Sequence, residues 1–169
     1  MKMSKTLNLS KTSKLTYSGM LIALSAVGAL IKINGSIAFD SMPGFFAALF
    51  LGPATGAIVA GLGHLLSALT SGFPLTMPMH IIVTFEMCIF AYTFGIAYRK
   101  TNGFFACLIG IILNGPIAAL VSVPTSIFLG LPLMGWKLFY VIILPLTVAS
   151  ILNVILAFLV FEILNKRMG

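Results

Sequence analysis

Apolar residues run almost without interruption through the chain, and short polar or Gly/Pro-containing breaks divide them into segments. A transmembrane helix needs roughly 20 apolar residues, so the chain has room for about six passes. The breaks predict spans at these residues: 15–33, 42–51, 54–71, 78–98, 104–129 and 138–164. The second span would rise only about 15 Å and is therefore a short helix. Barrel strands would alternate polar and apolar residues, which segment 141–152 does not do.

The fold class that this pattern predicts is an all-α integral membrane protein, a six-helix transmembrane bundle with a short second helix. Hydrophobic residues make up 60% of the chain and charged residues only 8%, which is far from a soluble composition. We expect a cytoplasmic N-terminal tail at 1–14 and one membrane domain at 15–169. Localisation would be the cell membrane, with multiple passes.

The net charge of +7 is arranged around the spans rather than along a nucleic-acid-binding face. Two of the ten basic residues, Lys32 and Lys137, border the predicted outer loops, and the other eight lie at the opposite ends of the spans: Lys2, Lys5, Lys11, Lys14, Arg99, Lys100, Lys166 and Arg167. Cytoplasmic loops and ends carry such an excess of Lys and Arg. The charges therefore predict that both termini are cytoplasmic, that loops 34–41, 72–77 and 130–137 face outside, and that nucleic acid is not a partner.

Four ionisable residues stand out because buried charge is costly in a membrane protein. Asp40, His64, His80 and Glu86 include two of the three acids and both histidines of the chain. At about 1.5 Å per residue, all four converge on the outer half of the bundle. Their agreement in depth indicates a site.

Each of the four residues also has a structural interpretation. Asp40 suits the N-cap of the helix that starts near Pro43. His64 could bond a carbonyl group on a neighbouring helix, and His80 could simply be solvated near the membrane surface. Glu86 could pair with either histidine or form a proton relay with it.

Catalysis is the weaker hypothesis. His80 and Glu86 lie six residues apart and do not share a helix face, and no His-x-x-x-His or His-Glu-x-x-His spacing is present. We expect no metal, no cofactor and no enzyme activity, although a small intramembrane enzyme stays an alternative. The two cysteines, Cys88 and Cys107, lie in apolar runs and are interpreted as small hydrophobic residues.

The first span carries small residues at a spacing of four: Gly19 with Ala23, and Ser25 with Ala29. Such stripes allow another helix to approach closely. The stripe therefore predicts either a docking face for a partner or ordinary packing within the bundle.

With these features the chain resembles the substrate-binding S-components of energy-coupling-factor (ECF) vitamin transporters over nearly its whole length. Gly19 and Ala23 match that family's Ala-x-x-x-Ala docking motif, with Gly in the first place. A narrower likeness, to the S-component for α-ribazole, a nucleoside used in cobalamin assembly, is carried by these segments: Ser36-Ile-Ala-Phe-Asp40-Ser-Met-Pro43, Leu51-Gly-Pro-Ala-Thr-Gly56, Gly63-His64-Leu-Leu-Ser67, Gly72-Phe-Pro-Leu and Pro78-Met-His80.

The resemblance implies a subunit that captures a vitamin or vitamin precursor from outside and topples in the membrane to release it inward. Its partners would be a transmembrane coupling subunit and two cytoplasmic ATPase subunits. The absence of an ATP-binding motif from the sequence agrees with energy supplied by those partners. The alternatives are an S-component for another vitamin, such as cobalamin or pantothenate, or a stand-alone proton-coupled carrier that uses Glu86 and a histidine.

A nucleoside ligand gives the polar residues specific roles. Asp40 or Glu86 would accept hydrogen bonds from ribose hydroxyls, and His64 or His80 would bond a ring nitrogen or a hydroxyl. Flat apolar walls would hold the aromatic base. The further candidates for the substrate site are Phe39, Phe45, Phe73, Asn114 and Trp136.

Overall fold

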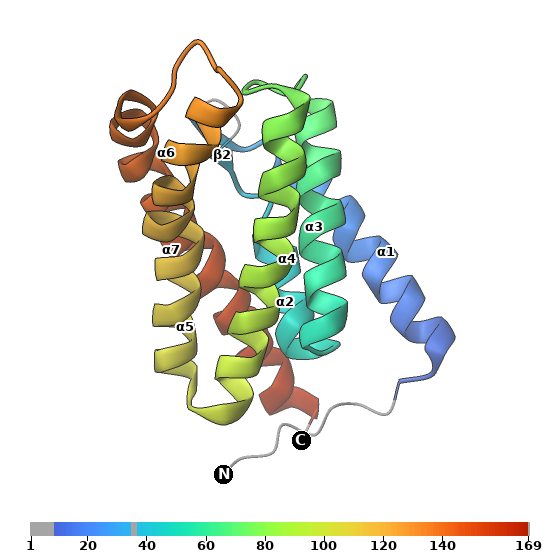
Figure 1. Cartoon of the computed structure of the whole chain (residues 1–169). Helices are drawn as coiled ribbons and strands as arrows, with labels where there is room; N and C mark the ends of the chain where they lie inside the picture. Colours follow the sequence, from blue (N-terminus) through green and yellow to red (C-terminus); the bar gives the residue numbers. More distant parts are fainter. Residues whose placement is uncertain (1–8, 35–36, 169) are drawn as a thin grey trace.

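The computed structural model describes residues 9–34 and 37–168, and almost all of them lie in helices (Figure 1). The helices are α1 Lys11–Gly28, α2 Met42–Phe50, α3 Pro53–Thr70, α4 Met77–Lys100, α5 Gly103–Ile112, the π-helix η1 Leu113–Ile117, α6 Ala118–Phe128 and α7 Trp136–Met168. Two short strands, β1 Lys32–Asn34 and β2 Ile37–Ala38, pair in antiparallel fashion. The helical class is thereby confirmed, and the hairpin is an addition to it.

Four helical segments are long and apolar enough to cross a membrane. They are Pro53–Thr70, Met77–Lys100, Gly103–Phe128 and Trp136–Arg167. The expected short second helix is α2, with nine residues. The count of six spans and the cytoplasmic placement of the termini stay predictions, because α1 and α2 are not among the four segments that reach this length and hydropathy within the described chain.

The first helix differs from the expected span at both ends. It begins at Lys11, inside the expected tail, because the hydroxyl of Ser10 accepts a hydrogen bond from the Ser13 amide and caps the helix. It ends at Gly28 rather than at residue 33, since the chain turns there into the β1–β2 hairpin. The backbone of Phe39, just after the hairpin, passes so close to Gly28 that no side chain would fit at that position.

The fifth span is one helical rod that changes character in its middle. α5 and α6 are joined by the π-helix η1, which contains Pro116. Proline has no N–H to give to the helical ladder, so a local π-bulge accommodates it. Asn114 lies in this bulge and is buried.

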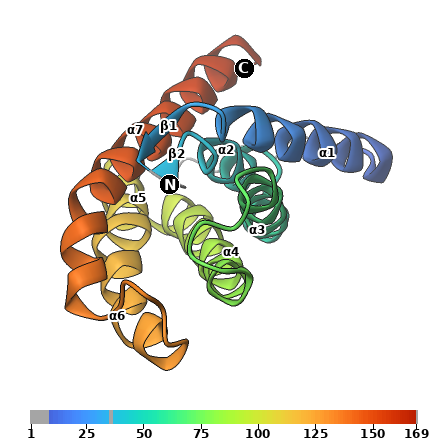
Figure 2. The ribbon, with the colours of Figure 1, turned by 90° about the horizontal axis from the view of Figure 1, so that it is seen from above.

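The tight core lies where α2, α4 and α7 cross. Phe45, Phe94 and Val154 are each fully buried there, and the rings of the two phenylalanines meet edge to face at 5.2 Å. α1 stands apart from this core: it leans against α3 and projects away from the other helices when seen from above (Figure 2). α1 begins and α7 ends at the same end of the bundle (Figure 1).

Candidate functional site

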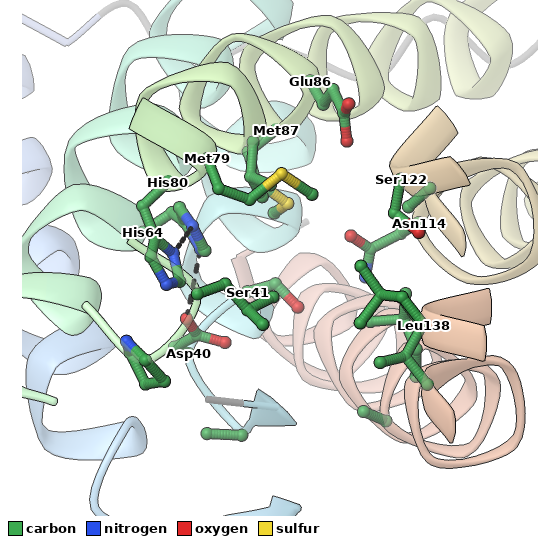
Figure 3. A pocket seen from close by; sticks show the side chains of 18 of the residues that line it. Asp40, Ser41, His64, Met79, His80, Glu86, Met87, Asn114, Ser122 and Leu138 are labelled. Carbon is green, nitrogen blue, oxygen red and sulfur yellow. Dashed lines mark hydrogen bonds and ion pairs between the residues drawn. The ribbon is translucent and has the colours of Figure 1, made fainter. Parts of the chain in front are cut away.

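A cavity of about 230 Å³ lies in the half of the bundle away from that shared end. Its walls come from α3, α4, α6 and α7, from the segment just before α2, and from the loops that follow α3 and α6. Most of the lining is apolar. The polar side chains that line it are Asp40, Ser41, His64, His80, Glu86, Asn114 and Ser122 (Figure 3). All four ionisable residues singled out from the sequence therefore meet in one place, together with Asn114.

Three of these polar residues form a chain of contacts at one side of the cavity. The Nδ1 atom of His64 lies 3.7 Å from a carboxylate oxygen of Asp40. The other ring nitrogen of His64, Nε2, lies 3.2 Å from Nδ1 of His80, within hydrogen-bonding distance. Asp40, His64 and His80 thus form a linear array, which Figure 3 marks with dashed lines. Among the described residues, no cluster of His, Cys, Asp or Glu is arranged to hold a metal ion.

His80 is the buried end of this array. Only 2% of the residue is exposed, and its Nε2 atom has no hydrogen-bonding partner among the described residues. The Thr84 hydroxyl donates to the backbone carbonyl of His80 at 2.7 Å, and the centroid of the Phe73 ring lies 5.9 Å from that of the imidazole. An unpaired buried nitrogen costs about 1–3 kcal/mol, so its presence beside a cavity calls for a ligand.

Glu86 lies deeper along α4 and stands apart from the array. Its side chain is half-buried and lines the cavity, and the described residues give its carboxylate no hydrogen bond or ion pair. Figure 3 shows the carboxyl group turned into the space between α4 and Asn114. The sequence predicted that Glu86 pairs with a histidine. Among the described residues it pairs with neither, and the two histidines bond to each other.

Asn114 and Ser122 add polar groups on the far wall. The Asn114 side-chain amide donates to the Ser150 hydroxyl on α7 at 3.0 Å, which leaves its carbonyl oxygen available to the cavity. Ser122 donates to the carbonyl of Ala119 at 2.6 Å. The π-bulge thus brings one amide to the cavity wall and ties it to the neighbouring helix.

The aromatic wall expected from the sequence differs from the one observed. Phe45 is 0% exposed in the tight core, and Trp136 is 56% exposed on the outer face of α7. Phe39 lines a separate apolar groove along α7, and Phe73 touches His80 from outside the cavity lining. The apolar lining comes instead from side chains that sequence reasoning missed, among them Met79, Met87, Phe90 and Leu138.

A further residue that sequence reasoning missed, Asn153, fixes the segment that carries Asp40. Its carbonyl oxygen accepts from the Met42 amide at 2.8 Å, and its amide donates to the carbonyls of Ala38 at 3.1 Å and Ala149 at 2.9 Å. One buried side chain on α7 therefore holds both ends of residues 38–42. The signal in the sequence was the one amide side chain in the apolar run 138–164.

The small residues of α1 divide between two faces of the helix. Gly19 and Ala23 are exposed, and a Cβ atom added at Gly19 would meet nothing within 4 Å. Ser25 and Ala29 are 0% and 2% exposed, and Ser25 packs directly against Gly63 of α3. The second pair therefore packs within the bundle, whereas a docking face for a partner stays a prediction that Gly19 and Ala23 are free to serve.

Long apolar helices around a small cavity with a few polar groups define a multi-pass membrane protein that binds a small molecule. The family model described as ECF transporter, substrate-specific component, matches residues 13–165, and the chain belongs to this family. It is therefore a membrane-embedded substrate-binding subunit of an ECF transporter rather than an enzyme. Neither the curated proteins nor the solved structures gave a match.

Proposed function

We propose that the cavity captures a vitamin or vitamin precursor from outside the cell, with α-ribazole as the preferred candidate. The single observation that carries this proposal is the cavity itself, in which a polar array and a separate carboxylate face mostly apolar walls. Transport would follow when the subunit topples against the transmembrane coupling subunit, with two ATPase subunits supplying the energy.

The charges of the lining favour a neutral ligand. Two carboxyl groups and two imidazoles line the cavity, whereas the side chains that the structure describes in its lining include no Lys or Arg. A carboxylate ligand such as pantothenate would lack the basic partner that anion recognition normally uses. A nucleoside has no charge of its own and offers several hydroxyl donors to the carboxylates.

The size of the cavity favours a compact ligand. Small-molecule sites commonly measure about 300–1,000 Å³, and this cavity measures about 230 Å³. Cobalamin, with its large corrin ring and appended nucleotide, is far too bulky for such a space. A two-ring base with one sugar is a better match.

Each end of a nucleoside finds suitable chemistry. The Glu86 carboxylate, which has no partner among the described residues, suits the paired hydroxyls of a ribose, since a carboxylate accepts two hydrogen bonds side by side. Met79, Met87 and Phe90 supply polarizable and aromatic surface for a flat base. Asn114 offers an additional acceptor on the far wall.

The distribution of charge supports an outward-facing cavity. Arg99 and Lys100 end α4, and Lys166 and Arg167 lie in the last turn of α7, at the end of the bundle opposite the cavity. By the positive-inside rule that end is cytoplasmic. The loop after α3, which contributes Pro74 and Leu75 to the lining, would then face outside.

The test is calorimetric titration of the purified subunit with α-ribazole, pantothenate and the free base dimethylbenzimidazole. We expect α-ribazole to bind tightly, the free base weakly and pantothenate not at all. Tighter binding of pantothenate would overturn the choice of ligand. Cellular uptake of α-ribazole that persists without the ATPase subunits and stops when the proton gradient is collapsed would overturn the ECF mechanism in favour of a proton-coupled carrier.

A further inference from the structure

The array of Asp40, His64 and His80 fixes more than the shape of the cavity wall. Each neutral imidazole has one nitrogen that donates a hydrogen bond and one that accepts, and the choice between them is set by the neighbours. A carboxylate only accepts. The order of groups in this array therefore determines the position of every ring proton, beginning from the acid.

The proton on each ring is fixed by the group that precedes it in the array. Asp40 faces Nδ1 of His64 at 3.7 Å, so that nitrogen carries the proton and is attracted to the carboxylate. Nε2 of His64 is then an acceptor, and the atom 3.2 Å from it, Nδ1 of His80, must be the donor. A neutral His80 with its proton on Nδ1 has a bare lone pair on Nε2.

We infer that Nε2 of His80 is a hydrogen-bond acceptor reserved for the substrate, and that the substrate must therefore donate to it from an O–H or N–H group. This inference rests on the proposed function, since it takes the cavity to be the substrate site. Nε2 is buried and has no partner in the part of the chain that the structure describes, and His80 lines the cavity. A donor on the ligand removes the cost of that unpaired atom.

An acceptor at Nε2 of His80 limits the orientations in which a nucleoside can bind in the cavity. The unsubstituted nitrogen of a benzimidazole base is an acceptor, so it cannot bond to an acceptor on His80. The group at His80 must instead be a ribose hydroxyl. Asp40 acts through His64 and is a positioning residue, whereas His80 is the residue that would contact the ligand.

Nitrogen-15 NMR of the histidine-labelled subunit in nanodiscs, without ligand and at pH 8, tests the proton positions directly. The chain contains only two histidines, so a version without a polyhistidine tag gives four ring-nitrogen signals. We expect protonated Nδ1 and unprotonated Nε2 in both rings. A protonated Nε2 on His80 would overturn the inference.

The variant Asp40→Asn tests the origin of the order, because an amide can donate as well as accept. We expect the Nε2-protonated form of His80 to become populated in this variant. The matched control is Glu162→Gln, which removes an acid that bonds to Tyr98 away from the cavity, and which should leave all four signals unchanged. Unchanged signals in Asp40→Asn would show that Asp40 does not set the array.

Ligand analogues separate the inference from the choice of ligand. Replacing single hydroxyls of α-ribazole with methoxy groups keeps an acceptor and removes a donor, and we expect one of these changes to weaken binding about tenfold or more. Equal binding of every analogue would overturn the inference and leave α-ribazole as the ligand. No binding of α-ribazole, with the NMR pattern as expected, would overturn the ligand and leave the proton order intact.

Discussion

The same helices serve two different purposes in the two halves of the bundle. One half surrounds the cavity, and the other holds the C-terminal ends of α4 and α7. In the second half, Phe94 of α4 and Val154 of α7 are fully buried in the same hydrophobic core. In the first half, α4 presents His80 and Glu86 to a space that no side chain fills. One helix therefore packs in the core along one part of its length and lines a cavity along another.

The closeness of the helices in the tight half depends on residues without side chains. A Cβ atom at Gly56 of α3 would run into the backbone of Ala48 of α2, and one at Gly44 would run into Ala60. The residues that line the cavity are larger, among them Met87 and Leu138. Small residues thus set where the bundle closes.

The largest effect should come from filling one of these close contacts. We expect Gly56→Leu to cost about 3 kcal/mol or more through overpacking, and so to lower the melting temperature by roughly 6–12 °C. Thermal unfolding in detergent measures the change. The matched control is Gly19→Leu, at an exposed position with open space around it, which should melt within about 2 °C of the native chain. Equal melting of both variants would contradict the role of the α2–α3 contact.

A change confined to the cavity half should affect binding and spare stability. We expect Glu86→Gln to weaken α-ribazole binding roughly 10–100-fold, because hydrogen bonds to a charged acceptor contribute about 1.5–3 kcal/mol. Titration calorimetry gives the affinity, and thermal unfolding should show no loss. Glu162→Gln, which alters an acid outside the cavity, serves as the control. An equal loss of affinity in both variants would contradict a specific role for Glu86.

A third change separates the two faces of α1. We expect Ala23→Trp to weaken association with the transmembrane coupling subunit about tenfold, because a bulky ring at a small-residue contact keeps helices apart. Ligand binding should be unchanged, since Ala23 does not line the cavity. Co-purification of the assembled transporter measures the effect. Leu108→Trp, at an exposed position on α5, is the control, and an equal loss there would contradict a docking face on α1.

The smallest effect should come from a residue that the sequence suggested for the aromatic wall. Trp136 is mostly exposed, so we expect Trp136→Ala to change ligand affinity by less than about twofold. Competition binding at equilibrium is sufficient to measure this. A larger loss would mean that the beginning of α7 moves over the cavity when the ligand is bound.

The polar part of the site could be predicted from the sequence because polar residues are rare in it. Asp40, His64, His80 and Glu86 have few alternatives to compete with, and their depth follows from the length of each span. The short second helix could be predicted for a different reason, because Gly52-Pro53 ends its apolar run after ten residues. Charge in an apolar chain is a strong local signal, and it survives small errors in the helix ends.

The apolar wall could not be predicted in the same way. α4 and α7 are apolar on every side, so their sequences carry no periodicity to show which face turns inward. Phe45 and Phe90 are indistinguishable by type, yet one fills the core and the other lines the cavity. The β1–β2 hairpin was missed for a related reason: its strands are too short to show an alternating pattern.

The three hydrogen bonds of Asn153 have a consequence for how the cavity opens. Two of them tether the segment from Ala38 to Met42 at both ends to one side chain of α7, so the segment cannot swing away without breaking both bonds at once. The loop at 129–135 is held in a similar way, since the hydroxyl of the buried Ser126 accepts from the Gly135 amide at 2.9 Å. For the loop at 71–76, the described hydrogen bonds lie within the loop or join it to the adjacent helix ends. We therefore expect the segment that carries Asp40 to keep its place when a ligand enters, and the loop at 71–76 to be the part that moves.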